Sequence, residues 1–99
     1  MNIKLVNRDT TGEFIIEGRL DTNTSPEVEK ILLRESERFD KIILNFSGLV
    51  YISSAGLRVL KCIYMAMQKK NGELTVTNVA RPVMEVLEMT GFAQLLNIE

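Results

Sequence analysis

The sequence predicts an α/β fold in which a mixed β-sheet of four to five strands is flanked by three or more helices. Short β-rich runs alternate with segments of helical periodicity in the order β-β-α-β-α-β-α, with a short last strand as an extension. The 99 residues can bury one ordinary core, and 45% apolar with 25% charged residues is typical of a globular protein. No linker-like or low-complexity stretch interrupts the pattern, so residues 1–99 are expected to form a single domain.

The N-terminal third predicts a hairpin followed by a helix. Asn2–Asn7 alternates apolar and polar residues like a half-buried strand, and Asp9–Gly12 supplies turn chemistry before a second strand at Glu13–Gly18. In Ser25-Pro26-Glu27, serine is expected to be the N-cap and proline the first helical residue. Apolar residues then recur at helical spacing, which predicts one buried face made of Val28, Ile31, Leu32 and Phe39.

The central segment predicts a buried strand and a long helix. Lys41–Phe46 is almost wholly apolar, which favours a central strand covered on both sides. Ser47-Gly48 is expected to turn the chain. The helical pattern from Ala55 to Lys70 is strong and ends at Asn71-Gly72.

The C-terminal third predicts a strand, a helix and a short strand. Glu73–Thr77 alternates like a strand, Arg81-Pro82 opens the last helix, and Gly91 ends it. Gln94–Ile98 is the candidate for the last strand. Right-handed crossovers place consecutive helices on one side of the sheet unless the chain reverses across it, and the pattern leaves the strand order open.

The composition argues against catalysis, nucleic-acid binding and membrane insertion. A net charge of −1 provides no basic footprint for nucleic acid. The chain has no histidine and a single cysteine, Cys62, which leaves no imidazole catalysis, disulfide framework or multi-thiolate metal site. Neither a signal peptide nor an apolar run of about 20 residues occurs. The protein is therefore expected to be cytoplasmic, without enzymatic activity, metal or cofactor.

The seam between the central strand and the long helix carries two serines and other small residues, Ser53-Ser54-Ala55-Gly56. One interpretation is helix capping, since the first N–H groups of a helix lack partners and Ser53 can accept from one of them. Capping explains one hydroxyl and leaves Ser54 without a role. It also leaves Gly56 unexplained, because glycine in a helix costs about 1 kcal/mol against alanine. The small residues therefore predict an uncovered backbone that a partner approaches closely.

The stretch Leu44–Leu57 (LNFSGLVYISSAGL) resembles the central motif of the STAS family, and in particular that of bacterial anti-sigma factor antagonists, the anti-anti-sigma factors. Gly18-Arg19-Leu20-Asp21, with Thr24 just before the first helix, is similar to a second short signature of that family. Gly91-Phe92 also matches, so the resemblance covers nearly the whole chain. It implies a STAS domain, whose mixed sheet flanked by helices agrees with the element order above.

The resemblance implies a partner-switching regulator. At the position of Ser54, family members carry a serine that is phosphorylated by an anti-sigma factor serine kinase with an ATP-binding fold like that of histidine kinases. The unphosphorylated protein binds this kinase and frees the sigma factor, the phosphorylated protein does not bind, and a serine phosphatase resets it. A phosphate at a helix N-terminus meets free N–H groups, so the fold is expected to tolerate it.

The resemblance also implies a partner-binding surface. Its residues come from the loop before the first helix and from the start of the long helix: Asp21, Thr22, Thr24, Ser53, Ser54, Ala55, Gly56, Leu57 and Arg58. Two simpler interpretations stay open, in which the loop only prepares the first helix and Arg58 is only a solvated side chain. As an alternative function, the chain is a STAS-type scaffold or accessory subunit of a transport or signalling complex, in which Ser54 is only a cap.

Overall fold

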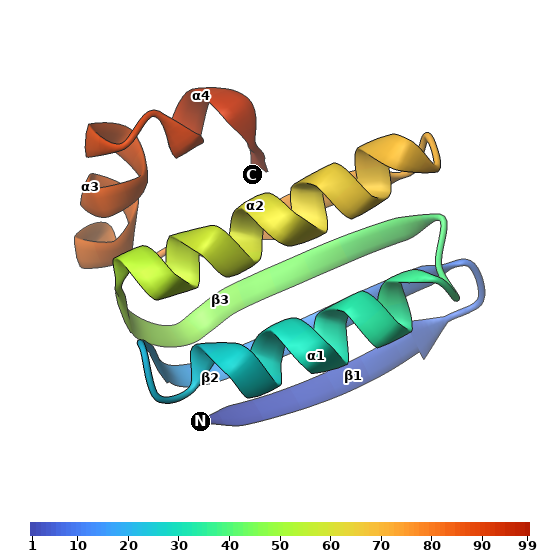
Figure 1. Ribbon diagram of the computed structural model, residues 1–99, viewed down its shortest axis with the longest axis horizontal. Coiled ribbons are helices and arrows are strands. Elements are labelled where there is room, and N and C mark those ends of the chain that lie inside the picture. The colour runs from blue at the N-terminus through green and yellow to red at the C-terminus, as the bar shows by residue number, and fades with distance from the viewer.

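The computed structural model describes residues 1–99, with five strands in one sheet and four helices (Figure 1). The elements follow in the order β1 (Asn2–Arg8), β2 (Thr11–Leu20), α1 (Ser25–Ser36), β3 (Lys41–Ile52), α2 (Ser54–Lys69), β4 (Glu73–Thr77), α3 (Arg81–Met89), α4 (Phe92–Leu95) and β5 (Asn97–Ile98). This order confirms the predicted fold class and adds α4, which the sequence pattern did not indicate. None of the helices is both long and apolar enough to span a membrane.

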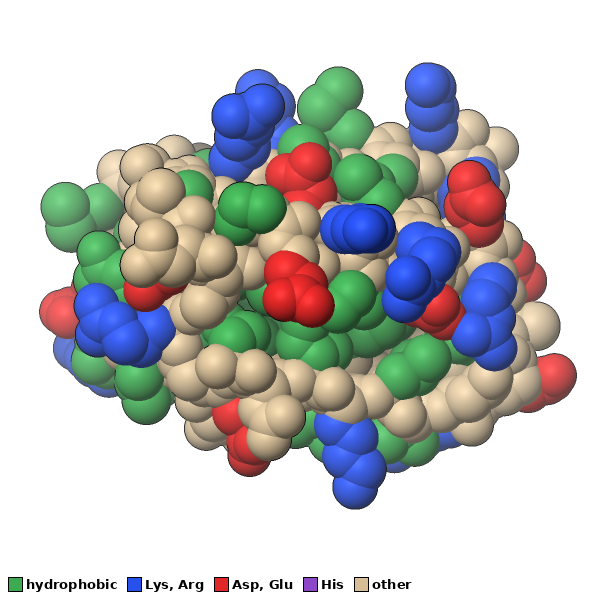
Figure 2. All heavy atoms as spheres, turned by 60° about the horizontal axis from the view of Figure 1, so that its bottom comes forward, with side chains coloured by type: hydrophobic (Ala, Val, Ile, Leu, Met, Phe, Trp, Pro, Cys, Tyr) green, Lys and Arg blue, Asp and Glu red, His purple; other side chains and the backbone are tan.

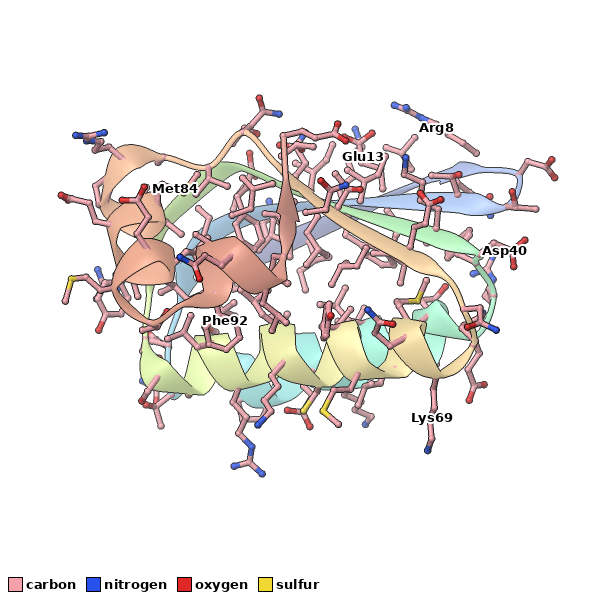
Figure 3. All side chains as sticks on the ribbon, turned by 90° about the horizontal axis from the view of Figure 1, so that it is seen from above. Arg8, Glu13, Asp40, Lys69, Met84 and Phe92 are labelled. Atoms are coloured by element: carbon pink, nitrogen blue, oxygen red, sulfur yellow. The ribbon has the colours of Figure 1, made fainter.

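The strands lie in the sheet in their sequence order, β1-β2-β3-β4-β5. β1 pairs antiparallel with β2, and the other three pairings are parallel. Because the order never reverses, right-handed crossovers deliver successive helices to the same side. α1 and α2 lie side by side across one face, with α3 at one end of the sheet (Figure 1), and no helix covers the opposite face (Figure 3). This topology brings the starts of α1 and α2 to the edge where β2 and β3 end.

The central strand β3 is continuous over 12 residues, so the predicted turn at Ser47-Gly48 is wrong. Its buried residues are unevenly spaced along the strand, at Ile42, Leu44, Phe46, Leu49 and Ile52. Each step of three instead of two marks an extra residue, and the register with β2 shifts at the same two places. Ser47-Gly48 lies at the first bulge and Val50 at the second. Bulges bend and twist a strand, so the end of β3 presents its side chains differently from its first half.

Polar side chains on the face of the sheet that no helix covers pair with one another. Ile43 and Asn45 of β3 point to this face and are half-buried, so the prediction of a strand covered on both sides is wrong. Asn45 Nδ2 donates to Glu13 at 3.0 Å, and Asn78 donates to Asn45 Oδ1 at 3.2 Å. Glu13 also pairs with Arg8 at 2.8 Å (Figure 3). Because its polar groups are hydrogen-bonded or ion-paired, this face can be exposed to water without a second layer of helices.

The start of α1 differs from the prediction. Thr24, rather than Ser25, occupies the N-cap position, and its side chain makes no capping hydrogen bond. Ser25 is the first helical residue, and its N–H donates to Asp21 O at 2.9 Å. The Ser25 hydroxyl is buried and has no hydrogen-bond partner. The position therefore uses the small size of serine rather than its capping oxygen.

The end of α1 is capped by a side chain that follows α2. Lys70 Nζ donates to the carbonyl oxygens of Phe39 at 2.8 Å, Ser36 at 3.0 Å and Glu37 at 3.4 Å. Phe39 was expected on the helix but lies beyond its end, where its ring meets that of Phe14 edge to face at 6.4 Å. The ammonium group thus joins the ends of the two long helices, at the edge opposite the serines.

Replacing Lys70 with methionine is expected to destabilise the fold by about 1–2 kcal/mol, because three carbonyl groups lose a charged donor. The apolar stem is preserved, so the loss reports the ammonium group rather than packing. Chemical denaturation measures the free energy of unfolding. Lys69→Met is the control, since Lys69 is exposed and points away from the sheet (Figure 3). Equal stabilities of the two variants would contradict the capping role.

The C-terminal segment closes the sheet beside β4. Gly91 ends α3 with a φ of 84°, the left-handed conformation that favours glycine, which confirms the predicted stop. α4 follows, and β5 occupies only the last part of the predicted strand, Asn97–Ile98. Leu96 is buried and Phe92 packs against the core, so this short tail is part of the folded unit.

Candidate functional site

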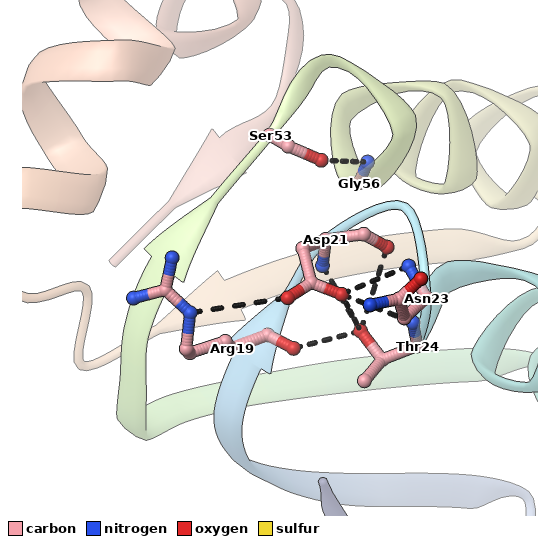
Figure 4. Close-up of polar contacts among 6 residues, drawn as sticks. All are labelled: Arg19, Asp21, Asn23, Thr24, Ser53 and Gly56. Atoms are coloured by element: carbon pink, nitrogen blue, oxygen red, sulfur yellow. Dashed lines mark hydrogen bonds and ion pairs between the residues drawn. The ribbon is translucent and has the colours of Figure 1, made fainter.

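The two serines occupy different positions at the start of α2. Ser53 is the N-cap, and its Oγ accepts a hydrogen bond from the Gly56 N–H at 3.4 Å (Figure 4). This confirms the cap predicted for Ser53. Ser54 is the first helical residue, is exposed to solvent and takes no part in the cap. Capping therefore uses one hydroxyl and leaves the other accessible.

The start of α2 is suited to a negative charge. The N–H groups of Ser54 and Ala55 precede the first intrahelical hydrogen bond, which runs from Leu57 N–H to Ser53 O at 2.9 Å. The first turn contains no acidic residue, and Arg58 is exposed one turn after Ser54. The positive end of the helix dipole is thus not compensated by a carboxylate within its own turn.

Gly56 and Leu57 face the interior rather than solvent. Both are buried, and a Cβ atom on Gly56 would lie 2.8 Å from Leu20 O and 2.7 Å from Ile52 Cγ1. The expectation that Gly56 leaves an uncovered backbone is therefore wrong. Glycine is required because α2 begins in close contact with the ends of β2 and β3, and this contact fixes the position of Ser54.

The loop before α1 is shaped by its own polar side chains. Asp21 Oδ1 accepts from the N–H groups of Asn23 at 3.0 Å and Thr24 at 3.1 Å. The Thr24 hydroxyl accepts from the Asp21 N–H at 2.9 Å and donates to Arg19 O at 2.7 Å (Figure 4). These contacts support the simpler interpretation, in which Asp21 and Thr24 shape the loop. Thr22, by contrast, is exposed.

The same contacts favour the ionised form of Asp21. The hydrogen bond from the Thr24 backbone N–H is the main cause that lowers the pKa of Asp21 below its usual value of 3.8. Desolvation opposes this effect, while the Asn23 N–H and the Thr24 hydroxyl reinforce it. Arg19, whose Nε lies 3.8 Å from Asp21 Oδ2, acts in the same direction. The loop is therefore built around a carboxylate.

Asp21 is expected to contribute stability that depends on pH. Its folded pKa is lower than its unfolded pKa, so the carboxylate stabilises the fold above the unfolded value, and this contribution is lost as the pH falls below 3.8 through the folded pKa. Thermal unfolding of the wild type and Asp21→Asn, from neutral pH to about pH 2, measures it. The difference in Tm between them is expected to shrink in acid. A difference that stays constant over this range would contradict the role of the charge.

The loop and the start of α2 meet at one edge of the molecule. The Ser53 N–H donates to Leu20 O at 2.9 Å, which holds the serines beside the loop. A hollow of about 360 Å³ lies between the first turns of α1 and α2, and its lining is Thr22, Ser25, Pro26, Glu29, Ala55 and Arg58. Three residues of the predicted surface, Thr22, Ala55 and Arg58, therefore share one hollow, and Ser54 adjoins it on α2.

A stacked pair that the sequence did not indicate lies at the same edge. The guanidinium carbon of Arg19 is 4.1 Å from the centre of the Tyr51 ring. Arg19 and Tyr51 are register partners of β2 and β3, one position before the last pair. Tyr51 is 40% exposed and Val50 is 61% exposed, which is unusual for large apolar residues in a central strand. The broken alternation of β3 was the signal that could have revealed them.

A second hollow runs between β1 and α1, and Figure 2 shows its hydrophobic floor with charged side chains around it. Its larger part measures about 410 Å³ and is lined by Met1, Ile3, Asn23, Thr24, Glu27, Val28 and Ile31. Of the predicted site residues only Thr24 reaches it. This hollow is therefore separate from the surface that carries Ser54.

Comparison with known proteins decides the family. The sequence profile of the STAS domain matches residues 2–99. The chain belongs to the STAS domain family. The anti-sigma F factor antagonist of Paenibacillus polymyxa is 31% identical to this STAS domain, and the match covers 99% of this chain and 87% of that relative. The family predicted from the serine motif is thereby confirmed.

Solved structures share the fold of this STAS domain. The anti-sigma factor antagonist SpoIIAA in its unphosphorylated form matches with a TM-score of 0.86 at 17% identity, over 99% of this chain and 88% of that one. The Bacillus cell fate determinant SpoIIAA in its phosphorylated form matches with a TM-score of 0.78 at 16% identity, over 99% and 91%. At these identities the likeness establishes the fold.

Proposed function

We propose that this STAS domain is an anti-sigma factor antagonist whose binding to an anti-sigma factor serine kinase is switched off by phosphorylation of Ser54. The unphosphorylated form binds the kinase and frees the sigma factor, and a serine phosphatase restores the hydroxyl. The role is regulatory rather than catalytic, is performed by residues 1–99 as one domain, and lies in the cytoplasm, where bacterial transcription is controlled.

The observation that carries the proposal is that the cap and the accessible hydroxyl are different serines. Ser53 satisfies the helix N-terminus, so Ser54 is exposed without a structural task at the same turn. Relatives named anti-sigma factor antagonists, and a STAS structure described in its phosphorylated form, support the same role. Thr22, Ala55 and Arg58 line the hollow beside the start of α2, and they are exposed or half-buried groups that a docked kinase can contact.

The chemistry of the proposed step places the catalytic groups on the kinase. Ser54 Oγ attacks the γ-phosphorus of ATP, the new O–P ester forms, and ADP leaves with the electron pair of the broken bond. The hydroxyl proton must pass to a base. This chain has no histidine, the first turn of α2 has no carboxylate, and the carboxylate at the adjoining hollow, Glu29, lies on α1, so the proposal assigns the base and the nucleotide site to the kinase.

Mass spectrometry of the intact protein after incubation with ATP and the candidate kinase tests the proposal. The wild type and Ser53→Ala are expected to gain one phosphate, and Ser54→Ala none. Ser53→Ala should remain a substrate, because losing the cap costs only about 1 kcal/mol of stability. Peptide mapping then locates the phosphate.

The other outcomes separate the alternatives. Tight binding to the kinase without any phosphate would leave a binding module that lacks the switch. Neither phosphate nor binding would overturn the proposal and favour a scaffold or accessory subunit of a transport or signalling complex. If Ser54→Ala still gained a phosphate, the modified residue would be one other than Ser54.

A further inference from the structure

The stacked pair at the ends of β2 and β3 has the properties of a binding element rather than of a structural one. We propose that Arg19, whose guanidinium group lies over the ring of Tyr51, receives a carboxylate side chain of the anti-sigma factor kinase and so extends the docking surface from Ser54 onto the uncovered face of the sheet. This inference rests on the proposed function and adds to it a residue that selects the partner.

The geometry fixes the orientation of the guanidinium group. Its carbon lies over the Tyr51 ring, 4.1 Å from the ring centre. Its Nε faces Asp21 Oδ2 at 3.8 Å (Figure 4). Asp21 is in turn held by the backbone N–H groups of its own loop. The Tyr51 ring and the Asp21 carboxylate therefore restrict the rotation of the Arg19 side chain before any partner arrives. This restriction lowers the entropic cost of binding.

The donors of Arg19 are otherwise unused. Nε faces Asp21 at a distance near the limit of an ion pair, and the two Nη groups donate to no protein acceptor. The side chain is 59% exposed, so these donors point to solvent. A planar guanidinium with a free edge matches a carboxylate in two parallel hydrogen bonds. Charge complementarity therefore selects an acidic group as its occupant.

The surroundings supply the apolar part of a contact. Val50 is displaced outward by the second bulge of β3 and is 61% exposed, next to the 40% exposed Tyr51. Arginine and tyrosine are over-represented among residues that dominate the binding energy of interfaces. An aspartate or glutamate of the partner, flanked by an apolar side chain, can engage Arg19 and Val50 together.

The pair also lies within one interface of the serine. Arg19 and Tyr51 immediately precede the Leu20–Ile52 pair, and Leu20 O accepts the hydrogen bond from the Ser53 N–H. Ser54 lies three positions after Tyr51 in the chain, a reach of at most about 10 Å. An interface of ordinary size, about 800 Å² on each partner, covers both positions. A kinase that docks on Ser54 therefore meets Arg19 in the same complex.

Binding of the unphosphorylated chain to the purified kinase, measured by calorimetry at two salt concentrations, tests the inference. Arg19→Gln is expected to weaken binding at least about tenfold and to reduce its salt dependence, because a charged contact is lost. Tyr51→Leu removes the ring that orients Arg19 and is expected to weaken binding less. Tyr51→Phe keeps the stacked face and is expected to bind like the wild type.

Arg38 provides a matched control within the chain. It also lies over an aromatic ring, Phe39 at 5.3 Å, and also pairs with an acidic residue, Glu35, but it follows α1 at the far end of the sheet. Arg38→Gln is expected to leave kinase affinity unchanged. Wild-type affinity of Arg19→Gln, or equal losses in both variants, would overturn the inference. Failure of the wild type itself to bind would instead overturn the proposed function.

Discussion

The phosphorylated protein is expected to bind the anti-sigma factor kinase at least about 100-fold more weakly than the unphosphorylated protein, a difference of about 2.7 kcal/mol. A phosphate on Ser54 adds about −1.5 to −2 charges at the centre of the proposed interface, and a charge buried there without a partner is costly. Calorimetry with the two forms at equal salt measures the change. A phosphorylated form that binds as tightly as the unphosphorylated one would contradict the switch.

The same modification is expected to leave the fold intact. The phosphate lies at the start of α2, where the N–H groups of Ser54 and Ala55 are free and the first turn has no carboxylate. The Tm of the phosphorylated form should therefore equal or exceed that of the unphosphorylated form. A large fall in Tm would mean that binding is lost through unfolding rather than through local repulsion.

Comparing Ser53→Asp with Ser54→Asp tests whether kinase binding responds to a negative charge at Ser54 itself or to any negative charge nearby. Aspartate is as good an N-cap as serine, so this variant keeps the cap and places a negative group one residue before the acceptor. It is expected to bind the kinase with affinity close to that of the wild type. Ser54→Asp, with one charge in place of nearly two, is expected to lose part of the affinity. Equal losses in both variants would show that the interface responds to charge in general and not to Ser54.

The fold was predictable because local patterns and topology agree in this chain. Helix starts, helix stops and β-rich runs each carried a separate signal, and Gly91 stops α3 in the structure as its residue type implied. The cap at Ser53 was predictable for the same reason, since capping is decided within four residues. In each of these correct predictions, the residues that determine the structure lie close in sequence to the element they determine.

Three features escaped prediction because the contacts that cause them are distant in sequence. Ser47-Gly48 has the composition of a turn, but pairing with β2 holds it in a bulge of a continuous strand. Lys70 has the position of a solvated helix end, but it caps carbonyl groups more than 30 residues earlier in the chain. The Arg19–Tyr51 stack depends on the register of two strands that α1 separates. Of these features, only the bulged end of β3 leaves a trace in the sequence, as a break in its alternation of apolar and polar residues.

Gly56 is the position where local and distant causes oppose each other most directly. Helix propensity alone predicts that Gly56→Ala stabilises α2 by about 1 kcal/mol. The structure predicts the opposite, because the new Cβ would lie 2.8 Å from the carbonyl oxygen of Leu20 and 2.9 Å from Leu20 Cγ. Overpacking of this kind typically costs 1–3 kcal/mol, and the backbone oxygen of a paired strand cannot rotate away.

Gly56→Ala is therefore expected to lower the free energy of unfolding by about 2 kcal/mol and the Tm by roughly 10 °C. Lys61→Ala, a substitution to alanine on the exposed face of the same helix, is expected to change stability by less than about 0.5 kcal/mol. The sign of the Gly56→Ala effect decides between the two causes, since an increase in Tm would mean that α2 moves off the strands easily. A decrease would mean that the contact of α2 with Leu20 is rigid, and this contact is what holds Ser54 beside the loop of Asp21 and the stacked Arg19. The proposed serine switch would then depend on Gly56, which is buried beneath the start of α2.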